Sequence, residues 1–330
     1  MGKRGKLQTT AEYAAARAII SGLGLLPRRA AVALGCGAGR VAYAFGGGLK
    51  RTGRRNLELA FPEKSADERE RLLRGSFVSL GRLLGEFSQF ERTTPDELRA
   101  LVEYDGLEHL EAARARGKGI IILTMHLGAW EVLSFAHSAL YEPLSFLVRP
   151  LDNERLEGMV ERIRGRFGNR PIDKKAAART ALRVLREGGT LGILADLNTQ
   201  TREGVFVPFF NHPACTTAGV ATLALRTDAA VIPVSAPWDA RRKRVVFRGE
   251  PPLALIRTGD PERDVRENTA LFAAAIERHV RANPDQWLWV HKRWRTRPAG
   301  EPDLYAAAAP PKVTTEPTTV SQRGYERHGA

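Results

Sequence analysis

The hydrophobic and polar positions of the chain change their period near residue 100. Between residues 65 and 89, apolar side chains recur at intervals of three and four residues, which predicts an amphipathic helix that faces a core. Ser65 and Glu68 have the capping-box spacing at its start. From Val102, short β-branched runs alternate with helical segments, which is typical of an α/β domain. We therefore expect a mostly parallel sheet flanked by helices.

The segment from Gly119 to Met125 is the clearest of these strands. It is continuously apolar and bounded by glycines, as expected for a strand buried on both faces. Further strands are predicted at 144–148, 191–195, 230–234 and 244–247, and helices at 128–140, 153–167, 176–187, 217–226 and 262–282.

Composition divides the chain into three parts. Residues 1–100 are predicted to form a helical, membrane-interfacial region, residues 101–297 the α/β domain, and residues 298–330 a disordered tail. The tail contains five prolines, an alanine run and Thr-Thr pairs, with too little apolar periodicity to build a core. We expect its deletion to change neither turnover nor thermal stability.

Basic residues are concentrated in the amino-terminal part of the chain. The 330 residues carry 51 Lys and Arg against 37 Asp and Glu, a formal net charge of +14, and the first sixty residues hold eleven of the basic residues but only two acids. This excess favours a polyanionic partner, namely an anionic membrane, an acidic substrate or a nucleic acid. The apolar stretches there are shorter than the about 20 residues that span a bilayer. We therefore expect peripheral membrane contact, with helices packed on the protein's own core as the alternative.

Cysteine usage sets the redox setting. Cys36 and Cys215 lie 179 residues apart and provide neither a disulfide framework nor a metal-ligand cluster. This suits a reducing cytoplasm, and the sequence calls for no metal and no cofactor.

The strongest candidate chemistry follows the strand at 119–125. His126 stands at its carboxyl end, Leu127-Gly128 can turn the chain, and Glu131 falls in the first turn of the next helix, from where it can reach the imidazole. An imidazole oriented by a carboxylate is a general base. The alternative is that His126 merely ends a strand beside a surface glutamate and has no catalytic role. Because the sequence has no Gly-x-Ser-x-Gly elbow, we expect the base to activate a substrate hydroxyl.

Two further strands deliver polar residues at their carboxyl ends, where open α/β sheets bind ligands. Arg149 can bind a phosphate or carbonyl oxygen, or can simply be a surface arginine near a turn. Asp196 can orient Arg149 or a neighbouring loop, or cap the loop that begins there. These two residues and Lys175 are predicted to bind substrate.

Residues 196–217 form an unusually long connection between predicted elements, and such loops are often functional. Phe209 and Phe210 are too apolar for an exposed loop. They are therefore predicted to line a slot for a hydrocarbon chain, or else to fold back on the core.

Four motifs in this order resemble those of the bacterial lipid A biosynthesis acyltransferases, within the lysophospholipid acyltransferase superfamily. They are His126-Leu-Gly-Ala-Trp-Glu131, Arg149-Pro150, Val205-Phe-Val-Pro-Phe-Phe210 and Pro284-Asp-Gln-Trp-Leu-Trp-Val-His-Lys-Arg-Trp294. Asn56-Leu-Glu-Leu-Ala-Phe-Pro62 is also similar, and the resemblance runs from about residue 15 to 297. The sequence departs from the family's usual pattern at Ala129, where asparagine is common, and at Asn211, where glycine is common.

The resemblance implies an enzyme that moves a fatty acyl chain from an acyl carrier protein thioester to a hydroxyl of a lipid-linked sugar. The His-x4-Glu pair would act as base and orienter, at the cytoplasmic face of the bacterial inner membrane. The acidic carrier protein and an anionic lipid acceptor both suit the basic surface. Acceptors such as a mannoside, an ornithine lipid or a glycerophospholipid remain open. A nucleic-acid-binding protein is the distant alternative, disfavoured because the basic residues lie among apolar helices rather than aromatic side chains.

Overall fold

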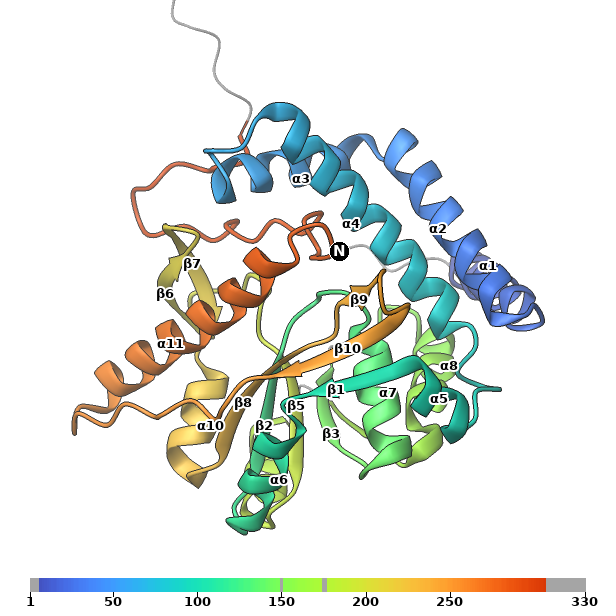
Figure 1. Cartoon of the computed structure of the whole chain (residues 1–330). Helices are drawn as coiled ribbons and strands as arrows, with labels where there is room; N and C mark the ends of the chain where they lie inside the picture. The colour runs from blue at the N-terminus through green and yellow to red at the C-terminus, as the bar shows by residue number, and fades with distance from the viewer. Residues whose placement is uncertain (1–5, 149–150, 174–176, 307–330) are drawn as a thin grey trace, which may run out of the picture.

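The computed structural model describes residues 6–148, 151–173 and 177–306 (Figure 1). An eight-stranded sheet lies at its centre, with strand order β1-β10-β8-β2-β5-β3-β4 and β9 paired to β10. The strands are β1 (Val102–Asp105), β2 (Ile120–Thr124), β3 (Ser145–Val148), β4 (Arg170–Asp173), β5 (Thr190–Leu194), β8 (Ala230–Ser235), β9 (Trp238–Asp239) and β10 (Arg244–Gly249). All neighbours are parallel except β10 with β8 and β9. The prediction of a mostly parallel sheet is confirmed.

Helices cover both faces of this sheet, because its central strands are apolar on both sides. Ile121 and Leu123 of β2 join a core with α9, α10 and α11, whereas Ile120 and Ile122 point to the other face, which α6 and α7 cover. These helices and those around them are α5 (Pro95–Leu101), α6 (Leu107–Ala115), α7 (Trp130–Leu140), α8 (Glu154–Arg164), α9 (Ala177–Arg186), α10 (Gly219–Thr227) and α11 (Pro261–Ala282), with a 3-10 turn at Gly165–Phe167. Strands β1, β4 and β9 were not predicted from the sequence, because each is short and lacks a distinctive apolar run.

The amino-terminal part is helical, as predicted, and consists of α1 (Lys6–Gly24), α2 (Arg28–Phe45), α3 (Gly47–Ala60) and α4 (Ala66–Phe87). The capping box of Ser65 and Glu68 opens α4, as the spacing indicated. Helices α2 and α4 run side by side (Figure 1), and their backbones approach closely at glycines: a Cβ added at Gly35 would lie 2.2 Å from the carbonyl oxygen of Gly81. Among the described residues, none of the helices combines the length and the apolar character needed to cross a membrane.

The segment 196–217, expected to be a long connection, instead contains a β-hairpin of β6 (Gly204–Phe209) and β7 (His212–Thr217). Phe209 pairs with His212, so Phe210 and Asn211 form a two-residue turn, with φ of 49° and 60°. Positive φ at both positions is what a type I′ hairpin turn needs, and it is uncommon for a phenylalanine. The hairpin escaped prediction because Phe-Asn lacks the usual Asn-Gly signature.

The chain after α11 returns to the amino-terminal helices. Asn56 of α3 is fully buried and its amide donates to the carbonyl oxygens of Trp289 and His291, both at 2.6 Å. Tyr305 donates its hydroxyl to Asn56 at 2.5 Å and receives the N–H of Trp294. Leu304 and Tyr305 therefore pack on the folded domain, although they lie in the stretch that was predicted to be a tail. The remaining tail lies outside the described residues.

Candidate active site

The site begins with two neighbouring parallel strands. Residues of β2 pair in register with β5, so that Thr124 lies beside Leu194. His126 follows β2 by two residues and Asp196 follows β5 by two residues. Because the carboxyl ends of adjacent parallel strands meet at one edge of the sheet, the two side chains are brought together.

Asp196 holds His126 in place. One carboxylate oxygen, Oδ1, lies 2.8 Å from Nδ1 of the imidazole. The other accepts the backbone N–H of His126 at 2.9 Å and the indole N–H of Trp287 at 2.8 Å. Asp196 is 1% exposed, so water does not compete for these hydrogen bonds. With Nδ1 directed at the carboxylate, Nε2 of the imidazole is the atom left for a substrate.

The same contact shifts both pKa values towards an ion pair. Burial lowers the pKa of His126, but the charge and hydrogen bond of Asp196 outweigh it, and the net pKa is raised. Burial raises the pKa of the Asp196 carboxyl, but His126 and its other donors lower it more, so its net pKa is lowered. The carboxylate thus stabilises the imidazolium that forms when His126 accepts a proton.

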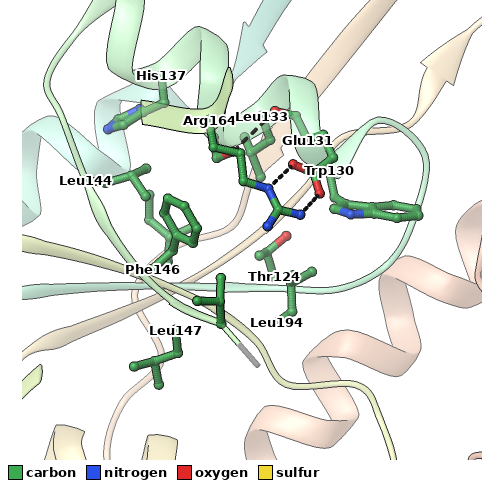
Figure 2. Close-up of a pocket in the computed structure, with 14 residues that line it drawn as sticks. Thr124, Trp130, Glu131, Leu133, His137, Leu144, Phe146, Leu147, Arg164 and Leu194 are labelled. Carbon is green, nitrogen blue, oxygen red and sulfur yellow. Dashed lines mark hydrogen bonds and ion pairs between the residues drawn. The ribbon is translucent and has the colours of Figure 1, made fainter. Parts of the chain in front are cut away.

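Glu131 does not make the predicted contact with the imidazole. Its carboxylate instead accepts two hydrogen bonds from the Arg164 guanidinium of α8, at 2.9 and 2.5 Å (Figure 2). The reason is geometric, because Glu131 is the second residue of α7 and faces α8, whereas the imidazole turns towards β5. Glu131 remains close enough for its charge to help raise the pKa of His126.

Two adjoining cavities lie beside these residues. The first, of about 580 Å³, is lined by His126, Glu131 and Arg164 and by apolar residues of α4 such as Leu84 and Phe87. The second is a narrow apolar slot of about 80 Å³ between α7 and the sheet, shown in Figure 2, which shares Glu131, Leu147, Val148, Arg164 and Leu194 with the first. The Glu131–Arg164 pair therefore lies in the wall that the two cavities share, and the remaining lining of both is mostly apolar.

Four other residues were predicted to bind substrate. Of these, Arg149 and Lys175 lie outside the described residues. Phe209 and Phe210 are 1% and 2% exposed and pack against aromatic rings, with ring centroids of Phe209 and Trp287 5.7 Å apart and of Phe210 and Phe61 5.2 Å apart. Neither lines the cavities beside His126, so the alternative of folding back on the core is the one observed. The cost of exposing two phenylalanine rings to water explains this placement.

A second layer supports the loop that carries Asp196. Arg293 is 1% exposed and donates to the carbonyl oxygen of Leu197 in this loop at 3.4 Å, and in β7 to the carbonyl oxygen of Cys215 at 3.0 Å and to Thr216 Oγ1 at 2.5 Å. Burial lowers the pKa of Arg293 to about 10, which still leaves it charged at neutral pH. The ring Nε2 of His291 accepts the backbone N–H of Asn198 at 3.1 Å. The motif at 284–294 thus acts on the site mainly through Trp287 and this loop.

Comparison with known proteins places this geometry in a family. The profile described as bacterial lipid A biosynthesis acyltransferase matches residues 3–296. The chain belongs to this family. It is therefore an acyltransferase, and the resemblance seen in the sequence motifs is confirmed.

Several relatives of this acyltransferase come from Escherichia coli K12. Its lipid A biosynthesis lauroyltransferase is 30% identical over 285 residues, which covers 85% of this chain and 90% of that protein. The palmitoleoyltransferase is 28% identical over 82% of this chain and 87% of its own length. The myristoyltransferase is 23% identical, with 87% and 88% covered.

Sequence reasoning missed two contacts of the candidate site. It expected Glu131 to contact the imidazole, whereas Asp196 does, because strand order, and hence the adjacency of β2 and β5, is not written in a single sequence. It also missed Arg164, which looks like an ordinary basic residue in the last turn of an amphipathic helix. The available signal was that His126 and Asp196 both directly follow predicted strands.

Proposed function

We propose that this acyltransferase moves a fatty acyl chain from an acyl carrier protein thioester to a hydroxyl of a lipid A precursor or a related glycolipid. One observation carries the proposal: the imidazole of His126, fixed at Nδ1 by buried Asp196, lines a cavity of about 580 Å³ that shares Glu131 and Arg164 with an adjoining apolar slot. A base and an apolar chain-binding pocket are the two things that acyl transfer to a lipid hydroxyl requires.

The chemistry uses His126 twice. Its Nε2 takes the proton of the acceptor hydroxyl while the oxygen attacks the thioester carbonyl, forming a carbon–oxygen bond and a tetrahedral intermediate. Collapse of that intermediate breaks the carbon–sulfur bond, and the imidazolium returns the proton to the departing thiolate. Asp196 stabilises the imidazolium between these two steps. Because a thioester is already activated, no nucleophile from the protein is needed.

We assign Glu131 and Arg164 to a joint role at the mouth of the slot. Their bidentate pair contributes both a carboxylate and a guanidinium to the wall shared by the two cavities. In this arrangement Glu131 acts on His126 through its charge and fixes the Arg164 guanidinium through Nε and Nη2, so that Nη1 is the atom that would donate to the reacting carbonyl oxygen. Arg149 and Lys175 remain proposed substrate-binding residues on the evidence of the sequence alone.

The basic surface supports an acidic donor and an anionic lipid surface. A groove of about 740 Å³ between α2, α4 and the start of β10 is lined by Arg28, Arg29, Arg40, Arg82 and Lys243. Arg82 lies over the Trp238 ring, 4.0 Å from its centroid. Such a groove attracts acidic partners over a distance set by the ionic strength.

Membrane association at the cytoplasmic face is proposed from the amino-terminal helices. Several large apolar side chains of these helices are exposed to solvent rather than packed in a core. They include Leu7, Leu25, Leu34, Val41 and Phe45. Basic residues surround them, the combination that favours the headgroup region of an anionic bilayer.

The decisive test is a transfer assay with purified full-length protein. Acyl carrier protein thioesters and coenzyme A thioesters are offered with lipid A precursors, a mannoside, an ornithine lipid and a lysophospholipid, and the products are identified by mass spectrometry. We expect transfer from the carrier protein to the lipid A precursor, reduced by about 10² to 10⁴ in His126→Ala and somewhat less in Glu131→Ala. Near-normal turnover by His126→Ala would refute the mechanism, and exclusive use of another acceptor would refute the assigned substrate.

A further inference from the structure

The apolar slot owes its existence to one glycine in the sheet. The strand register aligns Phe146 of β3, Gly192 of β5, Ile122 of β2 and Ile232 of β8 in one row across the sheet. Ile122 and Ile232 belong to the apolar cluster on the face that α7 covers, with Phe146 packed against it. Gly192 contributes no side chain to this row, so the floor of the slot is open between Phe146 and Ile122.

The backbone itself does not require glycine at this position. Gly192 is not among the glycines with positive φ, and an added Cβ would meet nothing closer than Leu144 Cδ1 at 3.4 Å and Phe146 Cβ at 3.8 Å. Glycine in the interior of a strand weakens the sheet and often marks a place where another group approaches closely. The missing side chain is therefore explained by the space that it leaves under α7.

His137, Leu133 and Ile122 line the slot and also line a further cavity, which contains Tyr104, Ile232 and Phe247. Figure 2 shows His137 and Trp130 at opposite ends of the group of side chains around the slot. His137 thus stands between two apolar spaces that lie over the same face of the sheet.

A histidine is an unfavourable residue for an apolar wall, because its polar ring nitrogens are buried there. It is 3% exposed, and its Nε2 has no hydrogen-bond partner among the described residues. Burial lowers its pKa to about 4, so the ring is neutral at physiological pH. The ring stacks on that of Tyr141. Thr124 Oγ1 and Tyr104 Oη beside the two cavities also lack partners within the described ranges. An apolar leucine would have sealed the wall without this cost.

We propose that Gly192 and His137 determine which acyl chain lengths the enzyme accepts. Gly192 keeps the slot deep enough for the chain, and His137 closes it off from the further cavity and so limits how far the chain extends. The inference rests on the proposed function, since it takes the slot as the site of the donor's acyl chain. It concerns specificity and gives neither residue a part in the bond-making steps.

The test measures a chain-length profile for each variant. Relative kcat/KM is determined with saturated acyl thioesters of even chain length, for the wild type, Gly192→Ala and His137→Ala. Each methylene group lost from or gained by an apolar pocket changes relative kcat/KM by about fourfold. We expect Gly192→Ala to lose activity selectively on the longest accepted chains and to shift the preferred length downwards. His137→Ala joins the two cavities and should shift it upwards.

Matched controls separate specificity from general damage. Ile193→Val changes the neighbouring residue of β5, which faces the opposite core, and Ser138→Ala changes the residue after His137, which lines neither cavity. Both should leave the shape of the profile unchanged, and thermal melting of all four variants checks their folding. Equal losses at every chain length in Gly192→Ala and His137→Ala would overturn the proposal, because purely structural roles produce that pattern.

A binding measurement separates this inference from the proposed function. Displacement of a fluorescent fatty acid by free fatty acids of increasing length reports the slot without any transfer. A length preference that moves with Gly192→Ala and His137→Ala supports the slot assignment even if the acceptor has been misassigned. The opposite result would be normal transfer activity in which neither variant changes the length preference, either in fatty-acid binding or in kcat/KM. That result would overturn the inference while the proposed function stands.

Discussion

Nδ1 of His126 lies 2.8 Å from Oδ1 of Asp196, although 70 residues separate the two in the sequence. The strands that precede them are hydrogen-bonded neighbours, and the carboxylate also anchors the backbone of His126 and the indole of Trp287. The position of the imidazole and the orientation of its Nδ1 are therefore fixed by the sheet, and the proposed dependence of the base on Asp196 can be tested directly.

Replacing Asp196 with asparagine should reduce kcat by about 10⁴, the loss typical of the corresponding aspartate in a serine protease triad. Asp196 accepts three hydrogen bonds, and an amide directed at Nδ1 would hold the imidazole in the wrong tautomer. Steady-state transfer assays provide the measurement. As a control, Trp287→Phe removes one donor but keeps the His126 contact, and its loss should be much smaller. Activity within tenfold of wild type for Asp196→Asn would contradict the assignment.

The pH dependence should report the same pair. His126 must be neutral to accept a proton, and Asp196 raises its pKa above the ordinary value of 6.5. We therefore expect kcat/KM to be low at pH values below this raised pKa and to increase as the pH rises through it. In Asp196→Asn the raising charge is lost, so the residual activity should have its acid limb at lower pH. An unmoved limb would show that another group titrates.

A double-mutant cycle tests Glu131 and Arg164, whose side chains are 14% and 24% exposed. Each side chain neutralises the charge of the other, and both are mostly buried. Glu131→Gln and Arg164→Met should therefore each lower the free energy of unfolding by about 1–3 kcal/mol, and the double variant should lower it by less than the sum of the two. Activity should fall equally in both single variants and no further in the double one. Losses that multiply would mean that the two residues act separately.

Truncation tests the ordered end of the chain. Ending the protein after residue 297 removes Tyr305, whose hydroxyl bonds Asn56, and Leu304, whose carbonyl oxygen accepts from Arg55. We expect this truncation to cost about 1–3 kcal/mol in the free energy of unfolding, measured in urea. Ending after residue 306 keeps these contacts and should leave stability unchanged. Equal stability of both forms would show that the packing of residues 298–306 contributes nothing.

Membrane binding should depend on the exposed apolar residues of α2. Leu34 and Phe45 are 56% and 86% exposed, and their joint replacement with serine should weaken sedimentation with anionic liposomes by at least tenfold, since burial of each side chain contributes about 1.5–3 kcal/mol. Tyr141→Ser, an exposed apolar change outside these helices, is the matched control.

The same experiment addresses the nucleic-acid alternative. At about 0.15 M salt the intact protein should bind anionic liposomes but not duplex DNA. Unchanged liposome binding by the α2 variant would place the membrane contact elsewhere, and tight DNA binding would revive the alternative.

The sequence by itself determined the local features. Apolar periods and caps located β2, α4 and α11 to within a few residues, because buried strands and capped amphipathic helices are specified by neighbouring residues. Ordered motifs identified the family, and the position of His126 after a buried strand made it the candidate base.

Only the tertiary structure decided which residues meet. The order of the strands placed Asp196, and not Glu131, on the imidazole, and the packing of α8 on α7 gave Glu131 to Arg164. The alignment of Gly192 with Phe146 and Ile122 depends on the same register. Pairing between distant segments is set by the packing of the whole sheet and its helices, and that information is spread over the chain rather than held in any one motif.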